Sequence, residues 1–326
     1  MSSSLARQVA ITFDDGPVLD HSGLLDPVSR NQAILCALAA AEAPACYFVN
    51  LSSTSPAGVQ ALAQAWLRAG HSLGNHTASH CNLDNPDTPL DAFVHSIADC
   101  DLALRHLGQP PHYFRYPYLR HGEDPVRRQR VEAALAGMAY QIAPVTLDTS
   151  DWRLDQHLQN RLRSTPAPPL EAYRQHYLAH IQQRSHAYAG LSGQLLGRAL
   201  PQILLLHHNL LNALFLADVL ALLRAQGWQF ISLEQALADP FYTAKAPPLL
   251  AGQSLLLAYC RAAHQPIDAR LTDNGDWDIA ALNAATTTAL PALDQALLTS
   301  RQQNLGSVDV LFPVAPGRVL GQGEAG

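Results

Sequence analysis

The stretch Gln8-Val9-Ala10-Ile11-Thr12-Phe13-Asp14-Asp15-Gly16-Pro17 opens with β-branched and apolar residues and ends in two adjacent carboxylates before a Gly-Pro turn. Residues 8–13 predict a strand, because such side chains favour extended backbone. The two carboxylates then stand at the carboxyl end of that strand, where α/β barrels carry active-site groups. Successive side chains of an extended chain point in different directions, so one Asp can bind a metal while the other faces a reacting atom. The sequence Asp-Asp-Gly-Pro is also typical of an ordinary surface turn.

Short strand-like runs alternate with longer helical runs from residue 8 to residue 242, which predicts an α/β fold with mainly parallel strands. About seven such units favour a barrel over an open sheet. Strands are expected at residues 8–13, 45–49, 113–115, 140–147, 203–206 and 228–232, and helices at 31–42, 55–69, 91–106, 125–136 and 211–224.

Two stretches break this alternation. Residues 153–200 are rich in Gln, Arg and His and predict a helical insertion over one face, which could cap a groove and restrict the site to short substrates. Residues 244–248 predict a linker, and no role is assigned to the segment that follows. The predicted organisation is a barrel over residues 1–243, with the insertion at about 153–200, and a C-terminal extension over 244–326.

The composition is that of a globular protein: of 326 residues, 48% are hydrophobic and 15% are charged, and the formal charge is −6 at pH 7. This balance predicts no nucleic-acid partner. No apolar run reaches about 18 residues, so no membrane span is expected. The five cysteines are an odd number without C-x-x-C spacing, which argues against a disulfide framework or a cysteine zinc site. The oligomeric state is not predicted.

The first seven residues, Met-Ser-Ser-Ser-Leu-Ala-Arg, contain no apolar signal core. We therefore expect a cytoplasmic protein if Met1 is the native start, and a periplasmic or secreted one if a signal peptide has been removed.

Histidine is frequent, with 15 residues, and two of them have the spacing of metal ligands. His76 and His80 stand four apart, which on a helical turn would place both imidazoles on one side. With one carboxylate they form a His, His, Asp set that leaves a coordination position for water, as in catalytic zinc sites. His176 and His180 are also four apart, but they lie in a polar stretch and are interpreted as a solvated helix face.

The order of these motifs resembles the polysaccharide deacetylases, carbohydrate esterase family 4, in which Thr-Phe-Asp-Asp-Gly-Pro is followed by His-Thr-x-x-His. The family's three remaining motifs are matched in order by Arg115-Tyr116-Pro117-Tyr118, Asp148-Thr149-Ser150-Asp151-Trp152 and Leu205-Leu206-His207. The five motifs span most of residues 8–242. The resemblance implies a distorted (β/α)7 or (β/α)8 barrel.

The resemblance also implies the roles of the metal-side residues. A divalent metal, usually zinc but cobalt or nickel in some relatives, would be held by Asp15, His76 and His80. Asp14 would be the general base, paired with Arg115. The backbone N–H of Tyr118 would stabilise the oxyanion.

The last two motifs would supply the acid and the substrate pocket. His207 would protonate the leaving amine, and Asp151 would orient it. On a strand, His208 points the opposite way from His207, so only one of them can face the site. The pocket for the acetyl group would be formed by Trp152, Leu205 and Pro117, of which the first two also suit an ordinary core.

The expected function is a metal-dependent hydrolase that removes N-acetyl groups from the amino sugars of a chitooligosaccharide-like or peptidoglycan-like glycan. Two alternatives stay open. One is deacylation of a small or lipid-linked N-acyl substrate, and the other is a non-catalytic protein that binds glycan or metal. Arg120 and His121 add cationic side chains near the predicted rim, which would suit either an anionic substrate or a solvated loop.

Overall fold

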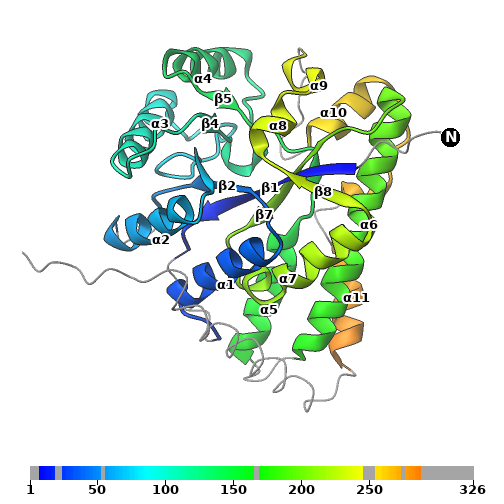
Figure 1. Ribbon diagram of the computed structural model, residues 1–326. Coiled ribbons are helices and arrows are strands. Elements are labelled where there is room, and N and C mark those ends of the chain that lie inside the picture. Colours follow the sequence, from blue (N-terminus) through cyan, green and yellow to red (C-terminus); the bar gives the residue numbers. More distant parts are fainter. Residues whose placement is uncertain are drawn as a thin grey trace, which may run out of the picture.

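The computed structural model describes residues 7–18, 24–52, 56–164, 169–244, 254–272 and 276–287. The predicted linker, apart from its first residue, and the extension beyond residue 287 lie outside the described residues. Within them, a twisted parallel sheet is surrounded by helices (Figure 1).

The sheet follows the order β5-β4-β3-β2-β1-β7-β6, with β8 also paired to β1, and every recorded pairing is parallel. The strands are β1 (Arg7–Gly16), β2 (Ala45–Val49), β3 (Ser72–Asn75), β4 (Tyr113–Phe114), β5 (Gln141–Ile142), β6 (Leu147–Asp148), β7 (Gln202–His207) and β8 (Trp228–Ile231).

The sheet curls toward closure. β5 and β6 stand at opposite ends of its order, yet only residues 143–146 connect them. The five steps from Ile142 to Leu147 reach at most about 18 Å when extended, so the two ends of the sheet lie near each other. The result is a half-barrel with surrounding helices, which confirms the predicted distorted α/β barrel. The single strand expected at 140–147 is in fact two, because its first part pairs with β4 and its last part with β7.

The five predicted barrel helices are present, except that the first begins four residues earlier, and two short helices between residues 233 and 243 were not predicted. Asp26 caps the first helix, since its carboxylate accepts the backbone N–H of Ser29 at 2.8 Å, and a proline occupies the first turn. The barrel helices are α1 (Pro27–Ala40), α2 (Pro56–Arg68), α3 (Leu90–Arg105), α4 (Pro125–Gly137), α7 (Leu210–Ala225), α8 (Leu233–Leu237) and α9 (Pro240–Thr243).

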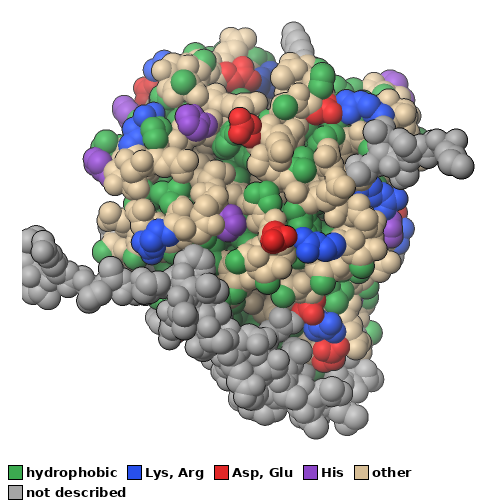
Figure 2. Space-filling model, viewed as in Figure 1, with side chains coloured by type: hydrophobic (Ala, Val, Ile, Leu, Met, Phe, Trp, Pro, Cys, Tyr) green, Lys and Arg blue, Asp and Glu red, His purple; other side chains and the backbone are tan. Residues whose placement is uncertain are grey.

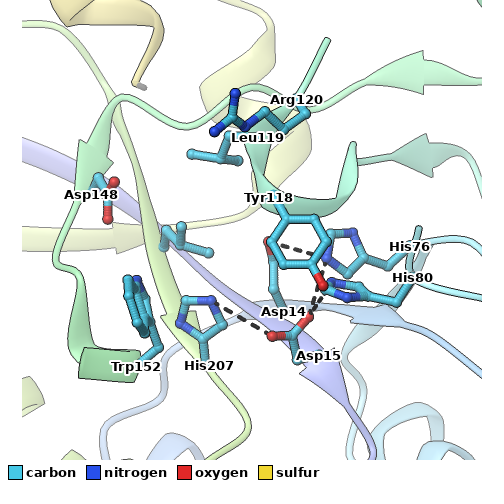
Figure 3. A pocket seen from close by; sticks show the side chains of 11 residues that line it. Asp14, Asp15, His76, His80, Tyr118, Leu119, Arg120, Asp148, Trp152 and His207 are labelled. Carbon is cyan, nitrogen blue, oxygen red and sulfur yellow. Dashed lines mark ion pairs between the residues drawn. The ribbon is translucent and has the colours of Figure 1, made fainter. Parts of the chain in front are cut away.

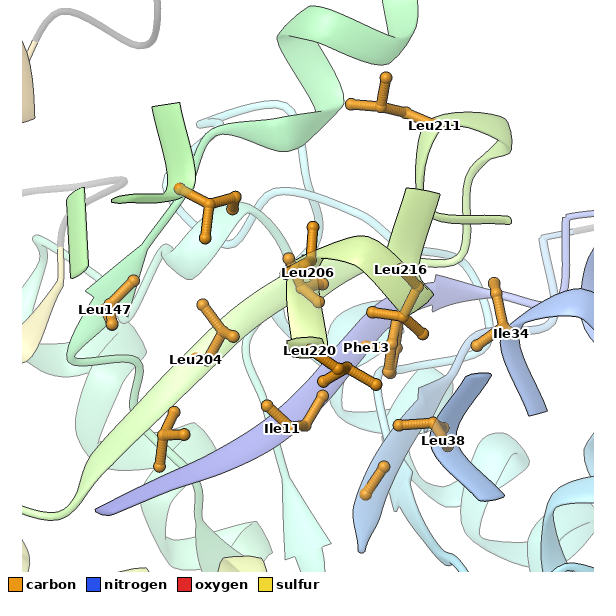
Figure 4. Close-up of a cluster of buried hydrophobic side chains, with 14 of the residues drawn as sticks. Ile11, Phe13, Ile34, Leu38, Leu147, Leu204, Leu206, Leu211, Leu216 and Leu220 are labelled. Carbon is orange, nitrogen blue, oxygen red and sulfur yellow. The ribbon is translucent and has the colours of Figure 1, made fainter. Parts of the chain in front are cut away.

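Strands β1 and β7 have one face in the hydrophobic core, and the other face carries Asp14 and His207. β1 and β7 pair in parallel with Asp14 opposite His207, so these two side chains lie on the same face of the sheet. The opposite face packs against helices α1 and α7 (Figure 4). Its buried side chains include Ile11 and Phe13 of β1, Leu204 and Leu206 of β7, Ile34 and Leu38 of α1, and Leu216 and Leu220 of α7.

The predicted insertion and the described part of the extension are helical and pack together. The insertion forms α5 (Asp151–Ser164) and the long α6 (Leu170–Leu196), and the extension contributes α10 (Leu255–Ala262), a 3₁₀ turn at Ala269–Leu271 and α11 (Asp276–Thr287). Helix α6 contacts α7, β6, α10 and α11 (Figure 1). The interpretation of His180 as part of a solvated face was wrong: its side chain is buried, because this side of α6 packs against the barrel.

The surface that Figure 2 shows has no division by charge over the described residues: acidic and basic side chains are interspersed among polar and apolar ones. Of the described helices, none is long and apolar enough to cross a membrane. Cys46, Cys100 and Cys260 are buried, as the sequence predicts for small apolar side chains.

The end of β1 passes so close to Tyr47 that no side chain fits at Gly16. A Cβ there would lie 1.9 Å from the Tyr47 hydroxyl oxygen. We expect Gly16→Ala to lower the free energy of unfolding by about 1–3 kcal/mol, as overpacking does. Gly190→Ala is the matched control, because a Cβ at this position in α6 meets nothing within 4 Å; it should raise stability by about 0.5–1 kcal/mol. Urea unfolding curves measure both, and equal stability of the two variants would contradict the prediction.

Candidate active site

A cavity of about 340 Å³ opens at the carboxyl ends of the strands. Side chains from all five sequence motifs or their immediate neighbours surround it (Figure 3). The lining residues are Asp14, Asp15, His76, His80, Tyr118, Leu119, Arg120, Asp148, Trp152, Leu205 and His207.

Three potential metal ligands converge at one side of this cavity. The Oδ1 atom of Asp15 lies 2.7 Å from His80 Nε2 and 3.4 Å from His76 Nε2. The ligand atoms of the three residues all lie within 4.8 Å of one another, the one such His, Cys, Asp or Glu group found among the described residues. Two imidazoles and one carboxylate are a donor set that catalytic zinc accepts.

The orientation of His76 supports this fit. Its Nδ1 lies 2.9 Å from the backbone carbonyl oxygen of Arg115, which can only accept a hydrogen bond. Nδ1 therefore carries a proton, and Nε2 is the ring nitrogen that faces Asp15. A backbone carbonyl that fixes the tautomer in this way is common behind metal-bound histidines. The residues present thus fit a divalent metal.

The two histidines do not lie on a helical turn, so that part of the sequence argument was wrong. His76 directly follows β3, and the backbone bends between it and His80. Thr77 and His80 have φ values of 65° and 51°, in the left-handed region that non-glycine residues seldom adopt. Asp15 and Tyr118 share this feature with φ values of 62° and 58°. Such strained backbone clusters at functional sites.

Asp14 is buried beside a buried arginine. Arg115 Nη1 donates to Asp14 Oδ1 at 2.7 Å and to Thr12 Oγ1 at the same distance. Arg115 Nε donates to the carbonyl of Ala143, and its guanidinium lies 4.1 Å from the centre of the Phe48 ring. These contacts leave little rotational freedom to the guanidinium, so it holds one oxygen of Asp14. The other oxygen, Oδ2, lies 3.7 Å from His76 Nε2.

His207, at the end of the adjacent strand β7, faces the three potential metal ligands Asp15, His76 and His80. Its Nε2 lies 3.9 Å from Asp15 Oδ2, while its Nδ1 lies 2.6 Å from Asp151 Oδ1. Burial alone would lower the pKa of His207, but the Asp151 charge and hydrogen bond outweigh it and raise that pKa to about 10. The His207 ring is therefore held as a proton donor with Nε2 toward the cavity.

Two asparagines that the sequence analysis missed complete this arrangement. Asn209 and Asn212 donate from their Nδ2 atoms to Asp151 Oδ2 at 2.9 and 2.6 Å, and the backbone N–H of His207 donates to the same oxygen at 3.0 Å. The buried carboxylate is thereby fully hydrogen-bonded and its pKa is lowered. The available signal was Asn209 as the N-cap of α7, three residues before Asn212.

His208 lies on the other side of the strand end, as the alternation of strand side chains predicts. It is fully buried, and its Nε2 lies 3.0 Å from Asn31 Oδ1. Burial lowers its pKa to about 3. His71, at the end of the loop after α2, is also buried, with its pKa lowered to about 4 for the same reason.

These two buried histidines predict acid sensitivity. Unfolding would return them to a pKa of about 6.5, so between that pH and their folded pKa values the unfolded chain binds more protons. Stability is therefore complete above pH 6.5 and falls as the pH falls, by up to about 1.4 kcal/mol per pH unit for each histidine. His71→Gln should flatten the slope between pH 7 and pH 5 in urea unfolding, and the exposed His106→Gln should not. An unchanged slope in His71→Gln would refute the prediction.

The predicted pocket residues divide into two groups. Trp152, whose side chain is 42% exposed, and Leu205 both line the cavity, whereas Pro117 is buried and is not among the lining residues. Leu119 and Arg120, one turn further along, are lining residues instead. Of the two predicted rim cations, His121 packs on the Tyr116 ring, and burial lowers its pKa to about 4, so it is neutral at pH 7.

Comparison with known proteins supports the family resemblance. Residues 3–138, which include the first three motifs, match the sequence model of the polysaccharide deacetylase family. The chitin deacetylase of Arthroderma benhamiae is 30% identical over 146 residues, which cover 44% of this chain and 35% of that protein. The first three curated relatives are matched over 35–52% of their own length.

Solved structures share the fold. The chitin deacetylase of Colletotrichum lindemuthianum superposes with a TM-score of 0.51 at 19% identity, over 72% of this chain and 90% of that one. A carbohydrate esterase family 4 pseudoenzyme from Bacillus anthracis superposes with a TM-score of 0.50 at 15% identity, over 72% of this chain and 66% of that one. Sequence model, relatives and fold together confirm the resemblance that the five motifs carry: residues 3–138 match the polysaccharide deacetylase family, and the chain shares its fold with a chitin deacetylase and a carbohydrate esterase family 4 pseudoenzyme.

Proposed function

We propose that this protein is a metal-dependent hydrolase that removes N-acetyl groups from the amino sugars of a glycan of the chitooligosaccharide or peptidoglycan type. The observation that carries the proposal is that a buried carboxylate, Asp14, and a partly exposed imidazole, His207, flank one set of potential metal ligands. Asp14 and His207 lie opposite each other on adjacent strands, and Asp15, His76 and His80 converge between them. Amide hydrolysis needs a base for the water and an acid for the amine in this kind of arrangement.

The metal would be held by Asp15, His76 and His80. Once bound, a divalent metal such as Zn²⁺ lowers the pKa of water and polarises a carbonyl oxygen. Cobalt and nickel suit the same ligands, since imidazole and carboxylate accept all three ions.

Asp14 is the general base of the proposal. Arg115 occupies its Oδ1, so Oδ2 is the oxygen left to accept a proton from the attacking water. The guanidinium also provides the buried Asp14 carboxylate with a partner of opposite charge at 2.7 Å. Because Arg115 is itself fixed by Thr12 and Ala143, the carboxylate is oriented before substrate binds.

His207 is the general acid. Its Nδ1 is engaged by Asp151, which leaves Nε2–H to donate to the nitrogen of the leaving amine. We assign the role of oxyanion donor to the backbone N–H of Tyr118, because this residue lines the cavity and lies in a left-handed turn. Trp152 and Leu205 offer apolar surface for the acetyl methyl group.

Two alternatives make different predictions. A small or lipid-linked N-acyl compound would also meet the base and acid in this cavity. A non-catalytic protein is represented in the family by the Bacillus anthracis pseudoenzyme. Retention of Asp14, Arg115 and His207 with the metal ligands favours an enzyme, because binding alone requires neither base nor acid.

The experiment is a measurement of acetate release from N-acetylated chitooligosaccharides, peptidoglycan fragments and small N-acetyl compounds, with and without added zinc. Zinc-dependent release from a glycan supports the proposal. Release from the small compounds alone supports a deacylase of small N-acyl substrates. Metal and glycan binding without acetate release from any substrate supports a non-catalytic protein.

Removal of one metal ligand tests the metal site separately. His80→Ala deletes one of two imidazoles, so we expect loss of stoichiometric zinc binding together with activity. Zinc content after gel filtration and acetate release measure the two effects. His106→Ala, an exposed histidine on the far end of α3, is the control and should retain zinc. Full zinc retention by His80→Ala would remove this residue from the ligand set.

A further inference from the structure

We propose that helix α6 of the insertion is a positioning element for the proton donor of the reaction. One face of the helix holds Asp151 and the backbone beside it, and Asp151 in turn holds His207. This inference rests on the proposed role of His207 as the general acid. No residue of α6 lines the cavity itself, so this helix acts from behind the site and not as a cap over it.

Three polar side chains of α6 point toward residues 148–151 and toward the Asn212 amide beside Asp151. Tyr177, His180 and Arg184 follow one another at spacings of three and four, so they share one face of the helix. All three are at most 3% exposed. Large polar side chains are seldom so deeply buried unless they are hydrogen-bonded.

The first contact reaches the Asp151 carboxylate through one intermediate. Tyr177 Oη donates to Asn212 Oδ1 at 2.7 Å, and Asn212 Nδ2 donates to Asp151 Oδ2 at 2.6 Å. The tyrosine hydroxyl thus fixes which way the Asn212 amide is turned. With the amide reversed, an oxygen would face the carboxylate and the contact would be repulsive.

The other two contacts hold the backbone that precedes Asp151. His180 Nε2 lies within hydrogen-bond distance of the carbonyl oxygen of Thr149, which can only accept, so His180 is the donor. Arg184 Nη1 donates to the carbonyl oxygen of Asp148 at 3.4 Å. Strand β6 is only two residues long, and Ser150 after it has a φ of 49°, so the sheet alone gives this turn little support.

The C-terminal extension is tied to the same face. Arg184 Nη2 donates to the carbonyl oxygen of Arg270, at 3.0 Å, in the 3₁₀ turn that precedes α11. One arginine therefore bridges the extension and the fourth motif. This gives the extension, to which the sequence assigned no role, a part in supporting the acid.

The leaving group provides a readout that separates positioning from general stability. An amine must be protonated as it leaves, so amide hydrolysis depends on His207, whereas 4-nitrophenolate leaves without a proton. A displaced His207 should slow deacetylation of N-acetylchitotetraose but spare hydrolysis of 4-nitrophenyl acetate. General unfolding or metal loss would slow both.

The test compares His180→Ala and Tyr177→Phe with the exposed His186→Ala as control, all zinc-loaded. We expect kcat for N-acetylchitotetraose to fall about 10²-fold in His180→Ala, since displacement of a catalytic group by about 1 Å has such effects. KM, zinc content and kcat for the ester should stay within about twofold of the wild type. His180→Gln retains an N–H donor and should recover part of the loss. Tyr177→Phe removes one hydroxyl only, so it keeps the test open if His180→Ala does not fold.

His207→Ala separates a failure of this inference from a failure of the proposed function. If His207→Ala loses both activities equally or neither, the assignment of the acid is wrong. If His207→Ala loses amide hydrolysis selectively while the α6 variants retain it, or lose both activities together, the positioning role of α6 is overturned. The positioning role of α6 is supported if His207→Ala and the α6 variants all lose amide hydrolysis selectively. The double variant that combines His180→Ala with His207→Ala should then lose no more amide hydrolysis than His207→Ala alone.

Discussion

Replacing Asp14 by Asn is expected to lower kcat/KM for acetate release from an N-acetylated chitooligosaccharide by about 10²- to 10⁴-fold, the usual contribution of a positioned general base. Asn has the same shape, and its Oδ1 can still accept from Arg115 Nη1. Its amide nitrogen has no free pair to accept a proton from water. Zinc content should stay at that of the wild type, because Asp14 is not one of the three converging ligands.

The matched variant is Asp15→Asn, one residue along. Asp15 Oδ1 lies between His76 and His80, so this change should lower zinc affinity as well as activity. Asp14→Asn also leaves the buried Arg115 without a charged partner, so folding must be checked by circular dichroism and thermal unfolding. Metal loss in Asp14→Asn with metal retention in Asp15→Asn would show that the two carboxylates have exchanged roles.

His207→Ala carries the second large effect. Removal of the proton donor should lower kcat for the amide substrate by about 10²- to 10⁴-fold. His208→Ala should change kcat far less but lower the melting temperature, because His208 is fully buried and contacts Asn31. Acetate release and thermal unfolding of the two variants measure the contrast.

The contrast follows from the register of the strands. Asp14 and His207 are direct partners on β1 and β7, so they share a face, and the next residue turns away. Equal loss of kcat in His207→Ala and His208→Ala, with both proteins folded, would contradict this account of the strand end.

The sequence predicts which residues form the candidate metal site, but not the backbone conformation that brings them together. His76 and His80 were selected by a helical spacing, yet they meet Asp15 across a strained bend after β3. The error has a physical cause: two histidines four apart can converge in several backbone conformations, and a four-residue strand such as β3 leaves almost no periodic signal.

The contacts behind the site could not be predicted because they are long-range. Asn209 and Asn212 reach Asp151 across more than 50 residues of sequence, and His180 reaches Thr149 across 31. A polar residue in a Gln- and Arg-rich helix has no local mark of burial. Only the packing of α6 against the barrel distinguishes His180 from the exposed His186.

The fold was predictable where apolar periodicity was strong. Strand β2 has the predicted bounds, and β7 differs by one residue at each end. The failures fall where tertiary pairing decides, as at residues 140–147, which divide between two neighbouring strands. Helix α1 begins earlier than predicted because the Asp26 cap, with Pro27 after it, precedes the apolar periodicity.

We propose that this cavity hydrolyses the N-acetyl group of an amino sugar with the help of a bound metal. The most direct test of this proposal is acetate release from N-acetylchitotetraose by wild-type protein that has been stripped of metal and then titrated with zinc, with the product examined by mass spectrometry. The account predicts no release from the stripped protein, release that rises to a plateau near one zinc per chain, and a product that has lost acetyl groups with its glycosidic bonds intact. Binding of zinc and of the tetramer without any acetate release would contradict it.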